Sequence, residues 1–433
     1  MPSLAACRAA RPIRAPRPTY DGGTRFLPAA QFPPMTDHPI RIPGRRLLHA
    51  PGPTPLPDEV LDALRRQPMD LGDPRVGANI AACEDGIRRL LHTASAEVFF
   101  YAANGHGAWE AVIANLLPPA ASGVAVLIPG TGHFSESWAI QTEALGGRVV
   151  RTPWRECWPI DSREIAAALR ADTDRRIAAV FVVHTDTASG VTSDLGEIRA
   201  AIDAAAHPAL LVVDMVASLG VVPMAMDSLR INVVVAASQK ALMAPPGVGI
   251  VVADERALAT AAGNPAPRFY WDWELRRSEL SYRKFCGTAP QNLMFALEAA
   301  IALIEREGVA QVHARHRALA GAVQAAVGGW SEGGALDFFA RDPATRSASV
   351  TTIATAPGVD VDALRTVARE RFQVAIAGGL GPLAGRAFRI GHLGDQNPAQ
   401  ILGALAGVQA ALVAQGIAHG DGMRPAIAAL AGG

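Results

Sequence analysis

Lys240 stands out in this chain because its type and its position are both unusual. Lys240 and Lys284 are the only lysines, so arginine fills the other 38 of the 40 basic positions. Arginine can form surface ion pairs, but it does not readily lose a proton and act as an amine nucleophile. Lys240 also follows the apolar run 231–237, where a solvated charge is unexpected. Composition and position are equally compatible with a Schiff-base lysine and with a snorkelling or ion-paired lysine.

Asp214 is the second residue of interest, because it ends another apolar run, 210–213. A buried carboxylate needs a cationic partner, and a direct ion pair with Lys240 could supply one. Alternatively, a cofactor lies between the two side chains. Pyridoxal phosphate requires a lysine, an acid at its ring nitrogen and a cradle for its phosphate. The small-residue turn at 102–108, which runs into an expected helix at 109–117, could provide that cradle through free backbone amides.

The elements that would position these residues alternate along the chain. Short apolar runs predict buried strands at 124–128, 178–183, 210–213, 233–236 and 249–252. Helices are expected between several of them, at 138–145, 162–169 and 195–205. This alternation predicts an α/β fold with a mostly parallel sheet that is covered on both faces. Ligands bind beyond the carboxyl ends of such strands, so residues 129–134, 184–187, 214–216 and 238–240 should share one site.

The chain is long enough for two domains. Two long helices, expected at 290–306 and 309–327, lead into a C-terminal part with helices at 361–371 and 399–415 and strands at 349–353 and 387–390. We expect a large cofactor-binding domain with an N-terminal arm at 47–300 and a smaller C-terminal domain at 301–433. Residues 1–46 are rich in arginine and proline, which indicates a disordered tail or an over-extended start, with a transit peptide as the weaker alternative.

Composition argues against several functional classes. The 40 basic and 40 acidic residues balance, and no apolar run approaches the length of a membrane span, so neither nucleic acid nor a membrane is the expected partner. The four cysteines form no Cys-x-x-Cys pair, which argues against a zinc site and favours a cytoplasmic protein. His313 and His316 are expected on a solvated helix face rather than at a metal, and Lys284 at the surface.

Six ordered motifs resemble those of the class V, fold-type I pyridoxal-phosphate aminotransferases, closest to serine–glyoxylate and alanine–glyoxylate aminotransferases. They are Pro51-Gly52-Pro53-Thr54; Asn104-Gly105-His106 with Trp109-Glu110; His184-Thr185-Asp186-Thr187-Ala188-Ser189-Gly190-Val191; Asp214-Met215-Val216-Ala217-Ser218-Leu219-Gly220; Ser238-Gln239-Lys240-Ala241-Leu242 followed by Pro245-Pro246-Gly247; and Phe388-Arg389-Ile390-Gly391-His392-Leu393-Gly394. The resemblance covers residues 47 to 415. It implies a large domain with a mostly parallel sheet and a smaller C-terminal α+β domain.

The resemblance also implies a cofactor, pyridoxal 5'-phosphate, and a role for each matching residue. Lys240 would form the internal aldimine and, once released, would move a proton between the substrate and cofactor carbons. Asp214 would hold the proton of the pyridine nitrogen. The remaining contacts would be made with the ring faces by Val216 and Phe134, with the 3-oxygen by Thr187, and with the phosphate by Asn104, Gly105, His106 and Gln239.

The implied substrates are a small amino acid and a 2-oxo acid. Arg389 would bind the substrate carboxylate as a bidentate fork, and Gly52 would line the substrate site. Thr288 would reach the phosphate of the neighbouring subunit, so a homodimer would share its active sites. The implied activity is amino transfer from serine or alanine to a 2-oxo acid, above all glyoxylate. The alternatives are an enzyme on the same scaffold that uses another amine, such as pyridoxamine or ureidoglycine, an enzyme that catalyses elimination, and a non-catalytic binding protein.

The chain departs from the family pattern at four places. Phe285 replaces a tyrosine, Pro55 replaces a polar residue, and residues 70–74 lack a His-Arg pair. Asp186 stands where glutamate is frequent. The expected cofactor contacts remain in place, so these departures bear on the choice of the amino donor.

Overall fold

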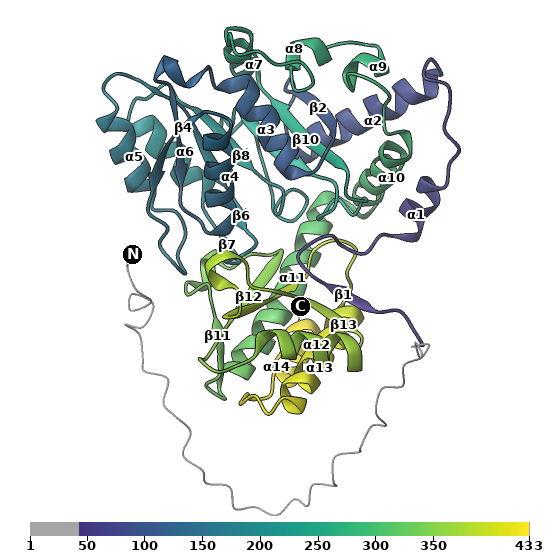
Figure 1. Ribbon diagram of the computed structural model, residues 1–433. Helices are drawn as coiled ribbons and strands as arrows, with labels where there is room; N and C mark the ends of the chain where they lie inside the picture. Colours follow the sequence, from purple (N-terminus) through teal and green to yellow (C-terminus); the bar gives the residue numbers. More distant parts are fainter. Residues whose placement is uncertain (1–42, 433) are drawn as a thin grey trace, which may run out of the picture.

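Two β-sheets organise the chain, as the ribbon view of the computed structural model shows (Figure 1). The structure describes residues 43–432. A seven-stranded sheet lies in the upper half of Figure 1 and a five-stranded sheet in the lower half. The tail expected at 1–46 therefore falls, up to residue 42, outside the described residues. Among residues 43–432, no helix combines the length and the apolar character needed to cross a membrane.

The seven-stranded sheet has the order β2-β10-β9-β8-β5-β3-β4. Its strands are β2 (Glu97–Ala102), β3 (Ala125–Pro129), β4 (Arg148–Thr152), β5 (Ile177–Val183), β8 (Leu210–Asp214), β9 (Val233–Ala237) and β10 (Val248–Ala253). The pairs β3–β4, β3–β5, β5–β8 and β8–β9 are parallel, whereas β10 is antiparallel to both neighbours. The mostly parallel sheet expected from the sequence is confirmed, and its predicted strands are β3, β5, β8, β9 and β10.

The central strands are apolar throughout because both faces of this sheet are buried. In β5, Val180 and Val182 join one hydrophobic cluster, while Phe181 and Val183 join a second cluster on the opposite face. The first cluster includes side chains of α2 (Pro74–Leu91), α5 (Ser162–Ala171), α6 (Leu195–Ala204) and α10 (Gln291–Glu307). The second includes side chains of α3 (Gly105–Leu116), α4 (His133–Ala144) and α7 (Glu255–Ala262). This two-sided cover explains why the strands do not alternate with polar residues.

The five-stranded sheet has the order β1-β13-β14-β12-β11. Its strands are β1 (Leu47–His49), β11 (Leu336–Phe338), β12 (Val350–Thr355), β13 (Val374–Gly378) and β14 (Ala387–Gly391). A third hydrophobic cluster joins it to α11 (Val309–Ser331), α12 (Val361–Arg371), α13 (Pro398–Ala414) and α14 (Met423–Ala431). Strand β1 pairs in parallel with β13, so the arm at residues 47–49 belongs to this second sheet.

Short elements complete the described chain. They are α1 (Asp58–Leu64), α8 (Trp273–Arg276), α9 (Ser281–Lys284), and the two-stranded ribbon of β6 (Thr185–Asp186) and β7 (Val191–Thr192), with 3-10 turns at Ala120–Ser122, Pro343–Thr345 and Gly381–Leu383. Helix α11 connects the two halves, because Val312 packs in the first cluster and Leu319 in the third. We propose that the two sheets with their helices are separate domains and that α11 bridges them.

Two expectations about surface residues are wrong. His313 and His316 do not lie on a solvated face, because both are buried where α11 packs against its neighbours. The Nδ1 atom of His316 donates to the carbonyl oxygen of Val312, and its Nε2 atom accepts from the amide of Gly394. Lys284 is only partly exposed, and its Nζ atom pairs with Glu84. Within the described part of the chain, no group of three or more metal-ligating side chains could hold a metal ion.

Candidate active site

The carboxyl ends of β5, β8 and β9 and the starts of α3 and α4 enclose a cavity of about 160 Å³. The cavity is lined by every cofactor-binding residue expected from the sequence except Thr288, namely Asn104, Gly105, His106, Phe134, Thr187, Asp214, Val216, Gln239 and Lys240. Four residues without an expected role also line it: Trp109, Val183, Thr185 and Ala217. The strand-end argument therefore identified one real cavity.

Lys240 lines this cavity from the segment that follows β9. Its Nζ atom donates to the carbonyl oxygen of Pro51. Burial, and after it the charge of Arg389, lowers the pKa of Lys240 to about 8, and Asp214 opposes this shift. More of this amine is therefore neutral near pH 7 than in an ordinary lysine, and the neutral amine is the nucleophilic form. Lys240 and Asp214 form no ion pair with each other; Asp214 is hydrogen-bonded elsewhere.

The turn at Gly52 packs directly against the Lys240 side chain. Gly52 has a φ of +103°, and a Cβ atom there would lie 2.7 Å from both Cε and Nζ of Lys240. The turn is also joined to the lysine segment, since Thr54 donates from Oγ1 to the carbonyl of Lys240 (2.9 Å) and from its amide to the carbonyl of Gln239 (3.2 Å). Glycine is therefore required both by the backbone conformation and by the close approach.

Asp214 is a buried carboxylate whose two oxygens are both hydrogen-bonded. Oδ1 accepts from the amide of Val216 at 2.7 Å, and Oδ2 accepts from Nε1 of Trp109 at 2.8 Å. Burial raises the pKa of Asp214 to about 7, and these two hydrogen bonds oppose that shift. A cationic ring nitrogen facing this carboxylate would lower the pKa again.

The N-terminus of α3 offers an anion site. Asn104 caps the helix, since its Oδ1 atom accepts from the amides of His106 (3.1 Å) and Gly107 (3.2 Å). A Cβ atom at Gly105 would lie 3.2 Å from the side chain of Val216, so glycine allows the start of the helix to approach Val216 closely. Gln239 contributes a buried Oε1 atom that has no hydrogen-bond partner. The positive end of the helix dipole favours a phosphate here.

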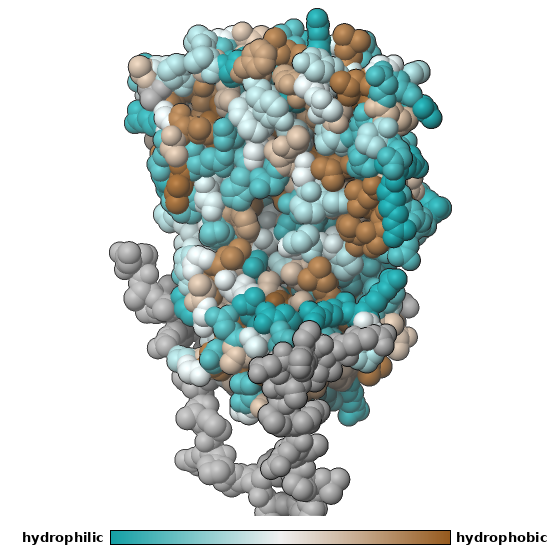
Figure 2. All heavy atoms as spheres, turned by 45° about the vertical axis from the view of Figure 1, so that its right-hand side comes forward, coloured by the Kyte–Doolittle hydropathy of each residue, from teal (hydrophilic) through white to brown (hydrophobic). Residues whose placement is uncertain are grey.

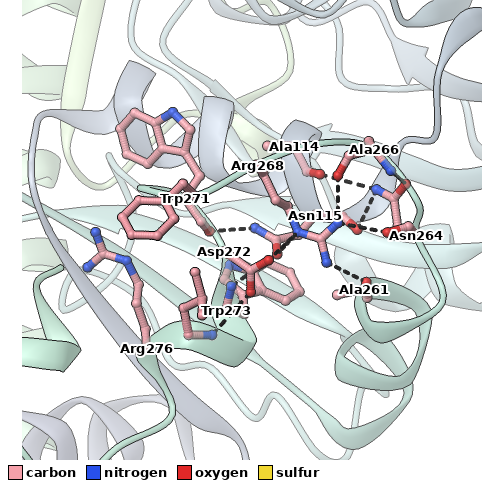
Figure 3. Close-up of polar contacts among 12 residues, drawn as sticks. Ala114, Asn115, Ala261, Asn264, Ala266, Arg268, Trp271, Asp272, Trp273 and Arg276 are labelled. Carbon is pink, nitrogen blue, oxygen red and sulfur yellow. Dashed lines mark hydrogen bonds and ion pairs between the residues drawn. The ribbon is translucent and has the colours of Figure 1, made fainter.

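A polar network fixes the opposite end of α3 (Figure 3). Asn264 donates from Nδ2 to three carbonyl oxygens at the end of this helix, at 3.0–3.1 Å. Asn115, on the last turn of α3, accepts from Nε of Arg268 and donates to the carbonyl of Trp271. These contacts satisfy the carbonyl groups that a helix end leaves unpaired. Helix α3 is therefore anchored at its C-terminus while its N-terminus faces the cavity.

Arg389 reaches the site from β14 of the second sheet. It does not line the 160 Å³ cavity, but its Nη1 atom donates to the carbonyl of Thr187 (2.9 Å) and its Nε atom to that of Gly378 (2.7 Å). Burial lowers the pKa of Arg389 to about 10, so the side chain remains cationic at neutral pH. A guanidinium has five N–H groups, and the described residues accept two of them, which leaves an Nη1–Nη2 fork for a carboxylate.

Asp186 holds the aromatic residue of the site, a role that the sequence did not reveal. It is fully buried, and its Oδ2 atom accepts from the amide of Phe134 (2.9 Å) and from Oγ1 of Thr131 (3.2 Å). Burial raises the pKa of Asp186, and its hydrogen bonds oppose that shift. The sequence signal that could have indicated this role is the position of Asp186 in the motif 184–191, directly after strand β5.

Thr288 lies apart from the other expected residues. It is exposed and lines a separate cavity of about 340 Å³ with Pro68 and Gln291. Its own chain therefore does not bring Thr288 to the cofactor cavity. Phe285, in the same segment, is buried in the first hydrophobic cluster, where the hydroxyl of a tyrosine would need a partner.

Comparison with known proteins decides the family. The model of the family "Aminotransferase class-V" matches residues 46–383. The chain belongs to this family. It is 37% identical to the serine–glyoxylate aminotransferase of Methylorubrum extorquens, over 87% of this chain and 93% of that protein. It is 36% identical to the L-aspartate–glyoxylate aminotransferase of Paracoccus denitrificans, over 82% of this chain and 88% of that protein.

A solved structure agrees with these relatives. The crystal structure of pyridoxamine–pyruvate aminotransferase from Mesorhizobium loti superposes with a TM-score of 0.81 and 27% identity, over 91% of this chain and all of that one. The protein is thus an aminotransferase of fold type I, and its cofactor is pyridoxal phosphate.

The cavity of this aminotransferase fits that cofactor. It offers an amine for the aldehyde, a carboxylate for the ring nitrogen and a helix N-terminus for the phosphate. The unpartnered amide of Gln239 lies beside the same helix start, and an amide can present either its oxygen or its NH₂ group after a flip. Phe134 and Val216 both line the cavity, as two residues that cover opposite ring faces must.

Proposed function

We propose that this aminotransferase moves the amino group of a small amino acid, serine or alanine, to a 2-oxo acid, with glyoxylate as the preferred acceptor. The observation that carries the proposal is the convergence of Lys240, Asp214 and Arg389 from two sheets on one site. An amine, a buried carboxylate and a guanidinium are the three groups that amino transfer between carboxylates requires. The glyoxylate-specific names of two relatives support the choice of acceptor.

Each of these side chains has a separate task. Pyridoxal phosphate, when bound, supplies an electron sink for the electrons of the substrate's Cα–H bond. Lys240 would bind the cofactor through Nζ. Once released as a free amine, it would take the proton from the substrate Cα and deliver it to the cofactor carbon. Its lowered pKa suits this use as a base. Asp214 holds the proton of the ring nitrogen.

The remaining residues bind and orient. The start of α3, with Asn104, Gly105, His106 and Gln239, holds the phosphate. Phe134 and Val216 hold the ring between them, and Thr187 faces its 3-oxygen. Arg389 binds the substrate carboxylate, and Gly52 leaves room for the lysine beside it. Both substrates carry a carboxylate, so a single arginine serves both halves of the reaction.

A screen of donors and acceptors tests this proposal. The purified enzyme would be given serine, alanine, aspartate and a carboxylate-free amine as donors, each with glyoxylate and with pyruvate, and kcat/KM would be measured for every pair. We expect serine or alanine with glyoxylate to give the highest value. A carboxylate-free amine with the highest value would refute the proposal and favour the alternative in which the donor is pyridoxamine-like.

We further propose a homodimer that shares its active sites. Thr288 is exposed and lies outside the cofactor cavity of its own chain, so it is free to serve a neighbouring one. The adjoining segment exposes large apolar side chains, with Phe269 at 73%, Leu280 at 61% and Tyr282 at 56% exposure. Figure 2 shows hydrophobic groups between hydrophilic ones on one face of the molecule. Exposed aromatic side chains of this size are typical of an interface.

Mixing two inactive variants tests the shared sites. Lys240→Ala and Thr288→Ala subunits, refolded together, would form mixed dimers in which one site carries both substitutions and the other carries neither. We expect mixing to restore activity well above that of either variant alone. Absence of any gain in proven mixed dimers would refute the sharing. We also propose a cytoplasmic location, since the four cysteines of the sequence form no Cys-x-x-Cys pair.

A further inference from the structure

Trp109 is the largest residue that lines the cavity without a role predicted from the sequence. It lies in the first turns of α3 and is 2% exposed. Its Nε1 atom donates to Oδ2 of Asp214 at 2.8 Å, so this carboxylate receives a hydrogen bond from a side chain as well as one from the backbone amide of Val216. A buried tryptophan usually finds a partner for its single N–H group, and here the partner is the acid of the active site.

The indole ring of Trp109 is packed among other rings. On one side it stacks on Trp138, with ring centroids 5.1 Å apart and 8° between the planes, and Trp138 in turn stacks on Phe181 at 4.6 Å. Near the cavity it contacts His106 at 4.6 Å and meets Phe134 edge-on at 6.5 Å. This packing and the 2% exposure of Trp109 hold the N–H group in the direction of Asp214.

The charges around Asp214 make such a donor consequential. Asp186 opposes the ionisation of Asp214, as burial does, and Lys240 favours it only weakly. The amide of Val216 and the indole of Trp109 supply one hydrogen bond to each carboxylate oxygen. Hydrogen bonds to an ionised carboxylate favour the ionised form and are stronger than those between neutral groups.

We propose that Trp109 is a positioning residue for amino transfer, which keeps Asp214 ionised and oriented toward the ring nitrogen of the cofactor. Because Trp109 lies on α3, the same helix then carries the phosphate cradle and the support for the ring-nitrogen acid. The cofactor is held at both ends by one rigid element, whose far end is fixed by Asn264. The inference rests on the role of Asp214 in the proposed function.

The chain offers a matched pair of variants. Trp109→Phe removes the N–H group and keeps an aromatic ring in the stack. Trp138→Phe removes the same atoms from the adjacent ring of that stack, whose Nε1 atom is buried without a hydrogen-bond partner. Both substitutions leave similar voids, but only the first deprives Asp214 of a donor.

Three measurements would be made on the holoenzymes and on the apoproteins. They are the rate and KM of the half-reaction with the best amino acid, the pH profile of kcat/KM together with the pH titration of the bound cofactor's absorbance, and the equilibrium constant for binding pyridoxal phosphate. A hydrogen bond to a charged group is worth enough that we expect Trp109→Phe to slow the half-reaction about tenfold to a hundredfold. In this variant, the acidic limb of the pH profile of kcat/KM should move up by about one pH unit. The KM should stay within about twofold of the parent.

Trp138→Phe should stay within about twofold of the parent in all three measurements, because it breaks no hydrogen bond. Equal effects of the two variants, or a parent-like rate and limb in Trp109→Phe, would overturn the inference and leave a packing role. Asp214→Asn separates this failure from that of the proposed function. If Asp214→Asn keeps the parent rate, the role of Asp214 itself fails; if it is slow while Trp109→Phe is normal, only the inference about Trp109 fails.

Discussion

Replacing Gly52 by alanine tests whether the turn at 51–54 positions Lys240. The new Cβ atom would lie 2.7 Å from both Cε and Nζ of Lys240, whereas an ordinary contact needs 3.4 Å or more. The new Cβ atom would lie closer still to Cδ of Lys240, so the lysine side chain, as the flexible partner, must retreat by about 1 Å. A misplacement of that size can slow catalysis about a hundredfold. We expect a hundredfold loss in the half-reaction and incomplete attachment of the cofactor to Lys240.

The backbone effect of this substitution needs its own control. Alanine at a φ of +103° is strained by about 1–2 kcal/mol, independently of any contact. Gly358 has a φ of +90° and nothing within 4 Å of a built Cβ atom, so Gly358→Ala carries the strain without touching the site. Both variants should lose similar stability in urea unfolding, and Gly358→Ala should turn over like the parent.

The assays are stopped-flow absorbance of the half-reaction and mass spectrometry after borohydride reduction of the holoenzyme. The fraction of Lys240 that carries the reduced cofactor reports the position of the amine directly. If Gly52→Ala reacted within about threefold of Gly358→Ala, the close approach of Gly52 to Lys240 would have no functional consequence, and the reasoning would be wrong.

Three more outcomes can be checked. Borohydride should fix the cofactor to Lys240 and not to Lys284, and Lys240→Arg should keep the charge but abolish turnover, since guanidinium does not form the bond to the aldehyde. Arg389→Lys should raise KM for amino acid and oxo acid together about tenfold to a hundredfold, with an unchanged cofactor spectrum. In the folded protein, burial lowers the pKa of His316 from 6.5 to about 4 and that of His392 from 6.5 to about 3. Below pH 6.5 the unfolded chain therefore binds more protons than the folded one, and the free energy of unfolding decreases as the pH is lowered. The free energy of unfolding, measured with urea, should decrease by about 3 kcal/mol per histidine between pH 7.5 and pH 4. In His316→Gln this decrease should be smaller.

The sequence predicted the parallel core well because its strands carry a local signal. A strand buried on both faces, such as β5 or β8, is a continuous apolar run that ends in a polar cluster. Strands β1, β11 and β13 were not predicted, because they are short and partly exposed and depend on pairing with a neighbouring strand. Strand β1 pairs with β13, β11 with β12, and β13 with β14. The buried state of His316 was also invisible, since its acceptor role is fulfilled by the amide of Gly394, 78 residues away.

The site shows the same division between local and non-local information. Asp214 and Lys240 could be selected from sequence because each is an ionisable residue next to a buried strand. The partners that fix them could not, because Trp109 reaches Asp214 across 105 residues and Pro51 reaches Lys240 across 189. Nothing in the local pattern distinguishes Trp109, which donates a hydrogen bond, from Trp138, which donates none.

The arm at residues 49–54 connects the surroundings of Lys240 with those of Arg389. His49 bonds through Nδ1 to the carbonyl of Gly391, and a Cβ atom at Gly391 would collide with the carbonyl of Ala50, so the arm lies against the end of β14. Strand β14 carries Arg389. In the same arm, the carbonyl of Pro51 accepts a hydrogen bond from Nζ of Lys240, and Thr54 donates one to the carbonyl of Lys240. The distance between Arg389 and Lys240 is therefore set through a few residues of backbone. This arrangement explains why the arm must be held in the second sheet by β1 even though it serves the cavity of the first.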